Sequence, residues 1–240
     1  MRRRDLIAST ASLLLAPAIV RAQAAWPNRQ VRFIVPFPPG GGTDTIGRII
    51  ADQLGKTFGQ TFVVDNRGGA GGTVGTVELA RAAPDGYTVG MITVGSHGIH
   101  PTLYAKLAYD PYKDFTPISM FASLPNLLAL HPSVPAKTVA ELIDLLKKNP
   151  GKYTFCSSGA GTSLHLSGEL FKQMTGVDML HVPYKGGGPA LIDLVAGQVH
   201  MIFGNAPSTW PLVKDGKLRG IAVTSPERSK IMPEFPAIAE

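Results

Sequence analysis

Glycine-rich turns that follow apolar runs are the features of this chain best suited to chemistry. Three such turns each precede a stretch with helical apolar spacing, at Pro36–Asp44, Ser157–Thr162 and Lys185–Pro189. A turn of this kind leaves backbone N–H groups unpaired at the start of a helix, where the helix dipole adds partial positive charge. Each turn therefore predicts a place where an anion can bind.

Common catalytic motifs do not fit the chain. Leu54-Gly55-Lys56-Thr57 has the end of a phosphate-binding loop, but Ile50 stands where that motif requires glycine. No G-x-G-x-x-G spacing occurs, and Gly95-Ser96-His97-Gly98 lacks the G-x-S-x-G spacing of a serine nucleophile. The sequence therefore favours a binding protein over an enzyme and predicts no nucleotide cofactor.

Metal and thiol chemistry have weak support in the sequence. His97 and His100 are three residues apart, but no matching third ligand occurs at metal spacing, and Gly98 and Pro101 disturb the helix that would align them. The single Cys156 ends an apolar run, which favours a buried core residue over a nucleophile. A lone cysteine cannot form an internal disulfide. We expect neither a metal ion nor another cofactor.

The N-terminus has the pattern of an export signal. A basic Arg2-Arg3-Arg4 precedes a short apolar stretch over Leu6–Val20, and Ala22-Gln23-Ala24 supplies small residues for cleavage. We predict a signal peptide over residues 1–24 and a periplasmic location, reached by the Sec or the twin-arginine route. Without this segment, 19 basic and 16 acidic residues remain. That mild basic excess suits a small anionic ligand and does not indicate a nucleic acid.

Short strands and helices alternate along the chain and would position the three turns. Apolar runs such as Val31–Pro36 and Tyr153–Cys156 alternate with helical spacing over Asp44–Phe58 and Ser163–Thr175. This alternation is typical of an α/β protein with parallel βαβ units. Since the first turn lies far from the other two in sequence, we expect two lobes that present their turns to one shared cleft.

The apolar pattern also suggests where the lobes divide. It changes around Thr116–Leu130, which we interpret as the crossover from one lobe to the other. We therefore predict that lobe one comprises residues 25–122 together with residues 225–240, and that lobe two comprises residues 123–224. After the last predicted strand, the chain is expected to turn back toward lobe one.

Five motifs in this order resemble the periplasmic solute-binding proteins of the tripartite tricarboxylate transporter family, also called the Bug family. The resemblance covers about Pro27 to Glu240, nearly the whole chain after the predicted signal peptide. The motifs are Pro36-Phe37-Pro38-Pro39-Gly40-Gly41-Gly42-Thr43-Asp44, Asp65-Asn66-Arg67-Gly68-Gly69-Ala70-Gly71-Gly72, Ser157-Ser158-Gly159-Ala160-Gly161-Thr162-Ser163-Leu164-His165-Leu166, Val182-Pro183-Tyr184-Lys185-Gly186-Gly187-Gly188-Pro189-Ala190 and Gly216-Lys217-Leu218-Arg219.

The resemblance implies a two-lobed periplasmic binding protein fold (Venus flytrap, type II-like) with the solute in the cleft between the lobes. It implies capture of a small carboxylate-bearing metabolite, such as a di- or tricarboxylate or another organic acid, for delivery to a membrane permease or sensor. The implied partners are this organic acid and the membrane subunits of the transporter, and we expect a monomer. Because such proteins continue past Glu240, we also expect the C-terminal part of lobe one to be missing.

The predicted ligand contacts come from the glycine turns and nearby strand ends. Glycine exposes backbone N–H groups, hydroxyl, amide and imidazole groups can donate to a carboxylate, and aromatic rings can form apolar walls. The predicted set is Phe37, Gly40, Gly42, Thr43, Asp44, Ser96, Ser158, Gly161, Thr162, His165, Tyr184 and Asn205.

Several of these side chains have a structural interpretation beside the binding one. Asp44 can cap its helix, and His165 can anchor its own turn. Lys185 is either a countercharge or an exposed lysine, and Asn66 and Arg67 either line the cleft or order their loop. The sequence leaves these alternatives open, as it does an exported hydrolase or a structural protein in place of a binding protein.

Overall fold

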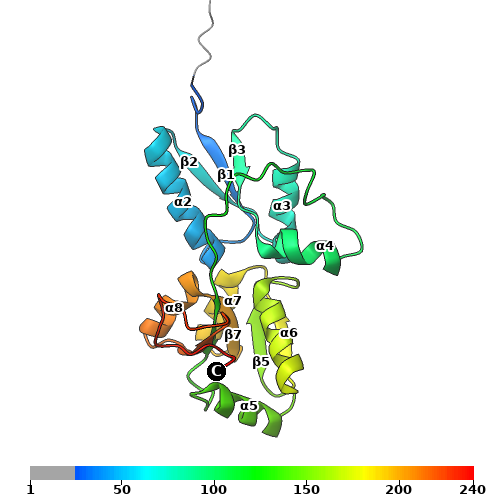
Figure 1. Cartoon of the computed structure of the whole chain (residues 1–240), viewed down its shortest axis with the longest axis vertical. Coiled ribbons are helices and arrows are strands. Elements are labelled where there is room, and N and C mark those ends of the chain that lie inside the picture. Colours follow the sequence, from blue (N-terminus) through cyan, green and yellow to red (C-terminus); the bar gives the residue numbers. More distant parts are fainter. Residues whose placement is uncertain (1–24) are drawn as a thin grey trace, which may run out of the picture.

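The computed structural model describes residues 25–240 and contains two α/β bodies stacked along the long axis of the molecule (Figure 1). Lobe one (residues 25–114) has a parallel three-stranded sheet of order β2-β1-β3. Its strands are β1 (Val31–Val35), β2 (Phe62–Asn66) and β3 (Thr88–Gly90). Because the strands are parallel, their carboxyl ends and the turns that follow lie at one edge of the sheet.

The helices of lobe one follow these strand ends. The first is α2 (Gly42–Phe58), whose apolar face packs on the core around Val31, Phe33 and Val35. A 3₁₀ turn (Ala70–Gly72) leads into α3 (Thr73–Ala80), and a π-helical turn (Gly95–Ile99) leads into α4 (His100–Leu103).

Lobe two (residues 126–240) has a mixed five-stranded sheet of order β6-β5-β7-β4-β8. Strand β4 runs antiparallel to β7 and β8, whereas β5 is parallel to β6 and β7. The strands are β4 (Asn126–Leu130), β5 (Thr154–Ser157), β6 (Leu180–Pro183), β7 (Met201–Asn205) and β8 (Arg219–Val223).

Helices cover both faces of the second sheet, so its central strands are buried on both sides. The helices are α5 (Val139–Lys148), α6 (Ser163–Thr175), α7 (Gly187–Val195) and α8 (Ala206–Lys214). Helices α5 and α6 pack on the side of Phe155 and Phe203, and α7 and α8 on the side of Cys156 and Ile202. Burial raises the pKa of the Cys156 thiol to about 12, as expected for a core residue.

Residues 225–240 lie on lobe two, which differs from the predicted division. The backbone N–H of Val223 donates to Pro236 O (2.8 Å), and that of Ile238 donates to Val223 O (2.9 Å). Met232 and Phe235 pack in a cluster with Leu127 of β4. These two apolar side chains find buried partners on lobe two, and the end of the chain lies beside that lobe (Figure 1).

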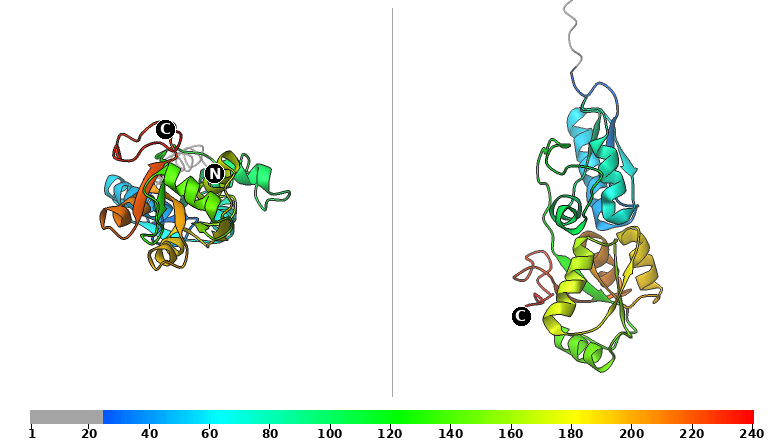
Figure 2. Two further views of the ribbon diagram at one scale, coloured as in Figure 1. Left: turned by 90° about the horizontal axis from the view of Figure 1, so that it is seen from below. Right: turned by 90° about the vertical axis from the view of Figure 1, so that its right-hand side faces the viewer.

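The connection between the lobes is a segment without helix or strand over residues 115–125, close to the predicted crossover. Figure 2 shows it running along one side of the elongated molecule. The predicted signal peptide over residues 1–24 lies outside the described part of the chain. Within residues 25–240, no helix combines the length and apolar character needed to cross a membrane.

Candidate functional site

The glycine turns of the two lobes meet at the boundary between them, which we call the seam. The first contact joins the turn Pro38–Gly42 of lobe one to Gly186–Gly188 of lobe two. A Cβ atom on Gly41 would lie 3.3 Å from Gly188 N and 3.4 Å from Gly187 Cα. These backbones therefore approach each other almost without intervening side chains.

The second contact joins the loop Gly69–Gly72 of lobe one to Gly159–Gly161 of lobe two. A Cβ atom on Gly159 would lie 3.1 Å from both Gly71 N and Gly71 Cα, and one on Gly95 would lie 3.2 Å from Gly161 O. Since Gly71, Gly159 and Gly161 also have positive φ angles of 63°, 122° and 74°, a side chain there would add backbone strain to the steric conflict.

Three helices begin at the first contact without a side-chain cap. The N-cap residues of α2, α7 and α8 are Gly41, Gly186 and Asn205, and none of them makes a side-chain cap hydrogen bond. A Cβ atom on Gly42 would lie only 2.5 Å from Asn205 Cβ, so α2 and α8 start side by side. In Figure 1 the lower end of α2 lies above α7 and α8. Three positive helix ends thus converge at one end of the seam.

The turn after β5 uses its donors locally instead. Thr162 caps α6 by accepting the His165 N–H (3.4 Å), and the Gly161 N–H donates to His165 Nδ1 (3.2 Å). The Gly159 N–H donates to Ser157 Oγ (3.1 Å). His165 therefore anchors its own turn, one of the two roles that the sequence left open, and this turn retains fewer donors for an anion than its glycines suggested.

Asp44 is buried within lobe one and fully hydrogen-bonded there. Its carboxylate accepts from Gly40 N (3.0 Å), Arg48 Nε (3.1 Å) and Asn66 Nδ2 (2.9 Å). Burial acts to raise the pKa of this carboxyl, but these donors outweigh that effect and lower it below its usual range. Asp44 thus fixes the turn before α2. Asp44 does not cap α2, because Gly41 is the N-cap residue and makes no side-chain cap hydrogen bond.

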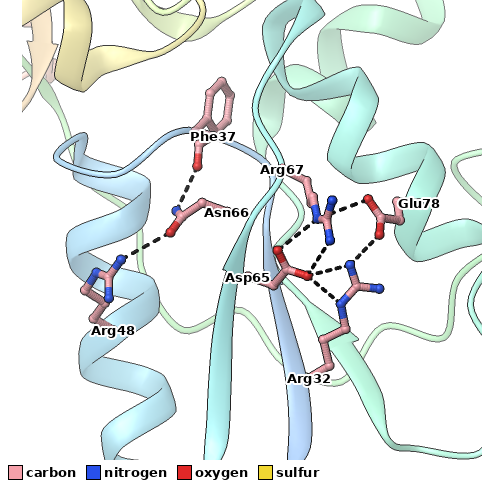
Figure 3. Close-up of polar contacts among 7 residues, drawn as sticks. All are labelled: Arg32, Phe37, Arg48, Asp65, Asn66, Arg67 and Glu78. Atoms are coloured by element: carbon pink, nitrogen blue, oxygen red, sulfur yellow. Dashed lines mark hydrogen bonds and ion pairs between the residues drawn. The ribbon is translucent and has the colours of Figure 1, made fainter.

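Asn66 and Arg67 also make their contacts inside lobe one (Figure 3). Asn66 donates to Phe37 O (2.8 Å) and accepts from Arg48 Nη2 (3.1 Å). Arg67 forms ion pairs with Asp65 (2.8 Å) and Glu78 (3.4 Å). These contacts order the loop after β2 and agree with the structural interpretation of both residues.

Most of the remaining predicted residues are buried or make hydrogen bonds to neighbouring side chains. Phe37 is buried against Gly72, whose added Cβ would lie 2.9 Å from its ring. Tyr184 donates its hydroxyl to Asp193 Oδ2 (2.7 Å) on α7, and Asn205 donates to Asn126 Oδ1 (3.0 Å). Ser158 is buried in the turn after β5.

Ser96 and Thr43 lie in different parts of the site. The Ser96 hydroxyl is buried and donates to Thr93 O (3.1 Å) within the π-helical turn. Thr43 is half-buried in the first turn of α2. The uncapped helix ends bring together four of the predicted residues, apart from the turn after β5. They are Gly40, Gly42, Thr43 and Asn205.

The sequence pattern does not predict two parts of this site. It predicts the turn at Gly186–Gly188 but no ligand contact within it, although glycine repeated before a helix is a visible signal. It did not predict α8 at all, because Pro207 and Pro211 argue against a helix. Among residues 25–240, no three His, Cys, Asp or Glu side chains gather as a group that could hold a metal ion.

A family model described as the tripartite tricarboxylate transporter family receptor matches residues 46–240. Protein BugT of Bordetella pertussis is 37% identical over 216 residues, which cover 90% of this chain and 66% of BugT. The chain thus spans about two thirds of this relative.

Two solved structures with bound acids share the fold. R. palustris Rpa4515 with adipate is 42% identical, has a TM-score of 0.87, and is matched over 89% of this chain and 72% of that one. MatC (Rpa3494) from Rhodopseudomonas palustris with bound malate is 35% identical, has a TM-score of 0.83, and is matched over 89% of this chain and 73% of that one. The predicted two-lobed binding-protein fold is confirmed.

Proposed function

The chain belongs to the tripartite tricarboxylate transporter receptor family, and we propose that it captures a small carboxylate-bearing metabolite between its two lobes. The observation that carries this proposal is the meeting of the uncapped N-termini of α2, α7 and α8 at the seam. Helix α2 comes from lobe one and the other two from lobe two. A carboxylate bound there would be held by both lobes.

The chemistry of these helix ends suits a carboxylate. Backbone N–H groups and helix dipoles attract an anion without a buried arginine, so the solute avoids much of the desolvation cost of a buried ion pair. One exposed helix end contributes only about 0.3–1 kcal/mol. Several acting together in a closed site could reach micromolar affinity, about −8 kcal/mol.

The relatives suggest which acids to consider first. Similar proteins of known structure contain adipate and malate, both of which carry two carboxylates. A second carboxylate could accept hydrogen bonds from other groups at the seam, for instance the Thr43 hydroxyl and the Asn205 side-chain amide. The proposed substrate class is therefore a di- or tricarboxylate or another small organic acid.

We further propose that the chain acts as a monomer in the periplasm and delivers its solute to membrane subunits of a tripartite tricarboxylate transporter. The family description supports this role, since the family is one of transporter receptors. The signal-like N-terminal sequence supports export by the Sec or the twin-arginine route.

A thermal-shift screen followed by calorimetry tests the proposal. The panel would contain adipate, malate, citrate, benzoate and nicotinate, with uncharged adipamide as the matched control. An acid at a hundredfold excess over its Kd should stabilise the protein by about 2.7 kcal/mol and raise its melting temperature, whereas adipamide should not. If no acid raises the melting temperature, or if adipamide does so equally, the proposal fails.

A further inference from the structure

One buried histidine of lobe one is covered by the backbone of lobe two. His100 begins α4 and is completely buried, although it lies at the edge of its own lobe. A Cβ atom on Gly161 of lobe two would lie 2.8 Å from His100 Nε2, and one on Gly71 would lie 3.3 Å from it. The imidazole is therefore enclosed between one turn from each lobe, and its burial depends on the contact between the lobes.

The two ring nitrogens of His100 face different lobes. Nδ1 lies 3.3 Å from Thr73 Oγ1, within lobe one. Nε2 is buried and makes no hydrogen bond to any group in residues 25–240. Burial lowers the pKa of His100, while the neighbouring backbone of Gly161 and Ala160 acts to raise it. Burial thus favours the neutral ring, which has one N–H to donate.

The surroundings of Nε2 indicate where that N–H is directed. If the Thr73 hydroxyl donates to Nδ1, the proton of the neutral ring is on Nε2. The carbonyl oxygen of Ala160 is the acceptor on that side, because a Cβ atom on Gly71 would lie 2.5 Å from Ala160 O and 3.3 Å from His100 Nε2. A buried N–H without an acceptor is unfavourable, so a small adjustment of the lobes that completes this bond is favoured.

His97, on the same segment, provides a contrast. Its Nδ1 lies 2.9 Å from Ser96 Oγ, and its ring packs at 4.7 Å against Phe115, the first residue of the connecting segment. Its Nε2 is also buried without a hydrogen-bond partner in the described chain, but no lobe-two glycine contact involves this ring. Of these two histidines, His100 is the one placed to sense lobe closure.

We propose that His100 is a positioning residue for solute capture: its Nε2–H donates across the seam to the Ala160–Gly161 backbone and holds the lobes together around the bound acid. The inference rests on the proposed function, because this hydrogen bond of His100, which we call the latch, would stabilise the same closed arrangement of the two lobes. The latch lies at the second glycine contact, whereas the proposed anion site lies at the first, so the two can be tested separately.

Two substitutions distinguish the effect of losing the N–H donor from the effect of changing the volume of the side chain. His100→Leu removes both nitrogens, and His100→Gln keeps an amide N–H at similar reach. We expect His100→Leu to weaken adipate or malate binding, measured by calorimetry, about tenfold. His100→Gln should recover affinity to within about threefold of the unaltered chain. His131→Leu, a substitution in lobe two away from the seam, should bind normally.

X-ray scattering without added acid gives a second readout that does not require a known ligand. His100→Leu should shift the radius of gyration to a larger value, and His100→Gln should not. Equal binding and equal scattering for His100→Leu and the unaltered chain would overturn the latch. So would a folded His100→Gln that loses as much affinity as His100→Leu, because packing alone would then explain both.

The same measurements distinguish failure of the latch from failure of the proposed function. If no acid binds the unaltered chain, the proposed function fails. The radius of gyration of His100→Leu, compared with that of the unaltered chain, then tests the latch by itself. If His100→Leu does not fold, His100→Phe replaces it, because phenylalanine keeps a ring of similar size without a donor. His100→Phe should then expand the molecule, and an unchanged radius would overturn the latch.

Discussion

Glycine at position 188 shows how the absence of one side chain can control the distance between two lobes. A Cβ atom there would overlap the carbonyl oxygen of Pro39 in lobe one. At the adjacent Gly187, a Cβ atom would lie 3.5 Å from Gly41 Cα, an ordinary contact distance. The two positions belong to the first turn of α7 and differ mainly in what faces them.

This difference predicts opposite outcomes for two neighbouring substitutions. Gly188→Ala should weaken adipate binding about tenfold or more, because its methyl group holds the lobes apart. Gly187→Ala should bind nearly normally and serves as the control. Calorimetry measures both affinities, and circular dichroism verifies that both variants fold. Equal affinities would argue against close approach of the two turns as a requirement for binding.

The charge of Asp44 is held by three donors within lobe one, and this predicts a pH dependence. Its pKa is lowered in the folded state, so its stabilising effect is present above its unfolded pKa of about 3.9 and is lost as pH falls through the folded value. Asp44→Asn should lower the free energy of unfolding by about 1–3 kcal/mol at pH 7. The difference in free energy of unfolding between this variant and the unaltered chain should become smaller only below about pH 4.

Urea unfolding at pH 7, 4 and 3 measures the effect of Asp44→Asn. The matched control is Asp52→Asn on the same helix, since Asp52 is exposed and pairs with Lys56 one turn away. Such a surface pair contributes little, so the control should unfold nearly like the unaltered chain at every pH. A constant difference for Asp44→Asn down to pH 3 would contradict the assigned role of its charge.

At the scale of elements, the helix N-termini divide into two kinds. Helices α5 and α6 begin with threonine caps at Thr138 and Thr162, which accept a backbone N–H three residues on. Helices α2 and α7 begin with glycine and make no side-chain cap. Capped ends are stabilised locally, whereas uncapped ends keep their donors for another acceptor.

Thr162→Ala tests whether this residue acts as a cap or as a ligand contact. Loss of the cap should lower the free energy of unfolding by about 0.5–2 kcal/mol, measured with urea. Adipate affinity should fall much less than in Gly188→Ala. Thr43→Ala, in the uncapped first turn of α2, should leave stability nearly unchanged. A large loss of affinity without loss of stability in Thr162→Ala would instead make Thr162 a ligand contact.

At the scale of the whole molecule, the two lobes are separate sheets that touch through glycine turns. Only the segment 115–125 connects them in the described chain, and it contains no helix or strand. Where glycine backbone faces glycine backbone, few apolar side chains are buried, so these contacts hold the lobes together weakly without a ligand. A solute bound by both lobes would favour their closed arrangement.

We therefore expect a bound acid to make the molecule more compact. X-ray scattering with saturating adipate should give a smaller radius of gyration than scattering without it. Adipamide at the same concentration should leave the radius unchanged. Binding of adipate by calorimetry with no change in radius would show that the lobes are already fixed, and closure would then not be part of capture.

The sequence by itself determined the local elements and the family. The apolar spacing over Ser163–Thr175 predicted α6 with its observed bounds, and the spacing over Asp44–Phe58 predicted α2 to within two residues at its start. Such signals lie within about fifteen residues and depend on backbone propensity and helical period. The glycine turns were visible for the same reason, and their order along the chain identified the family.

Only the tertiary structure decided which turns keep their donors and where the chain end packs. The turn after β5 is satisfied by His165, a partner four residues away whose role the sequence left open. The approach of Gly42 to Asn205 and the cover of His100 by Gly161 join residues far apart in sequence. Pairings of this kind depend on how two folded lobes fit together, and no local pattern encodes that fit.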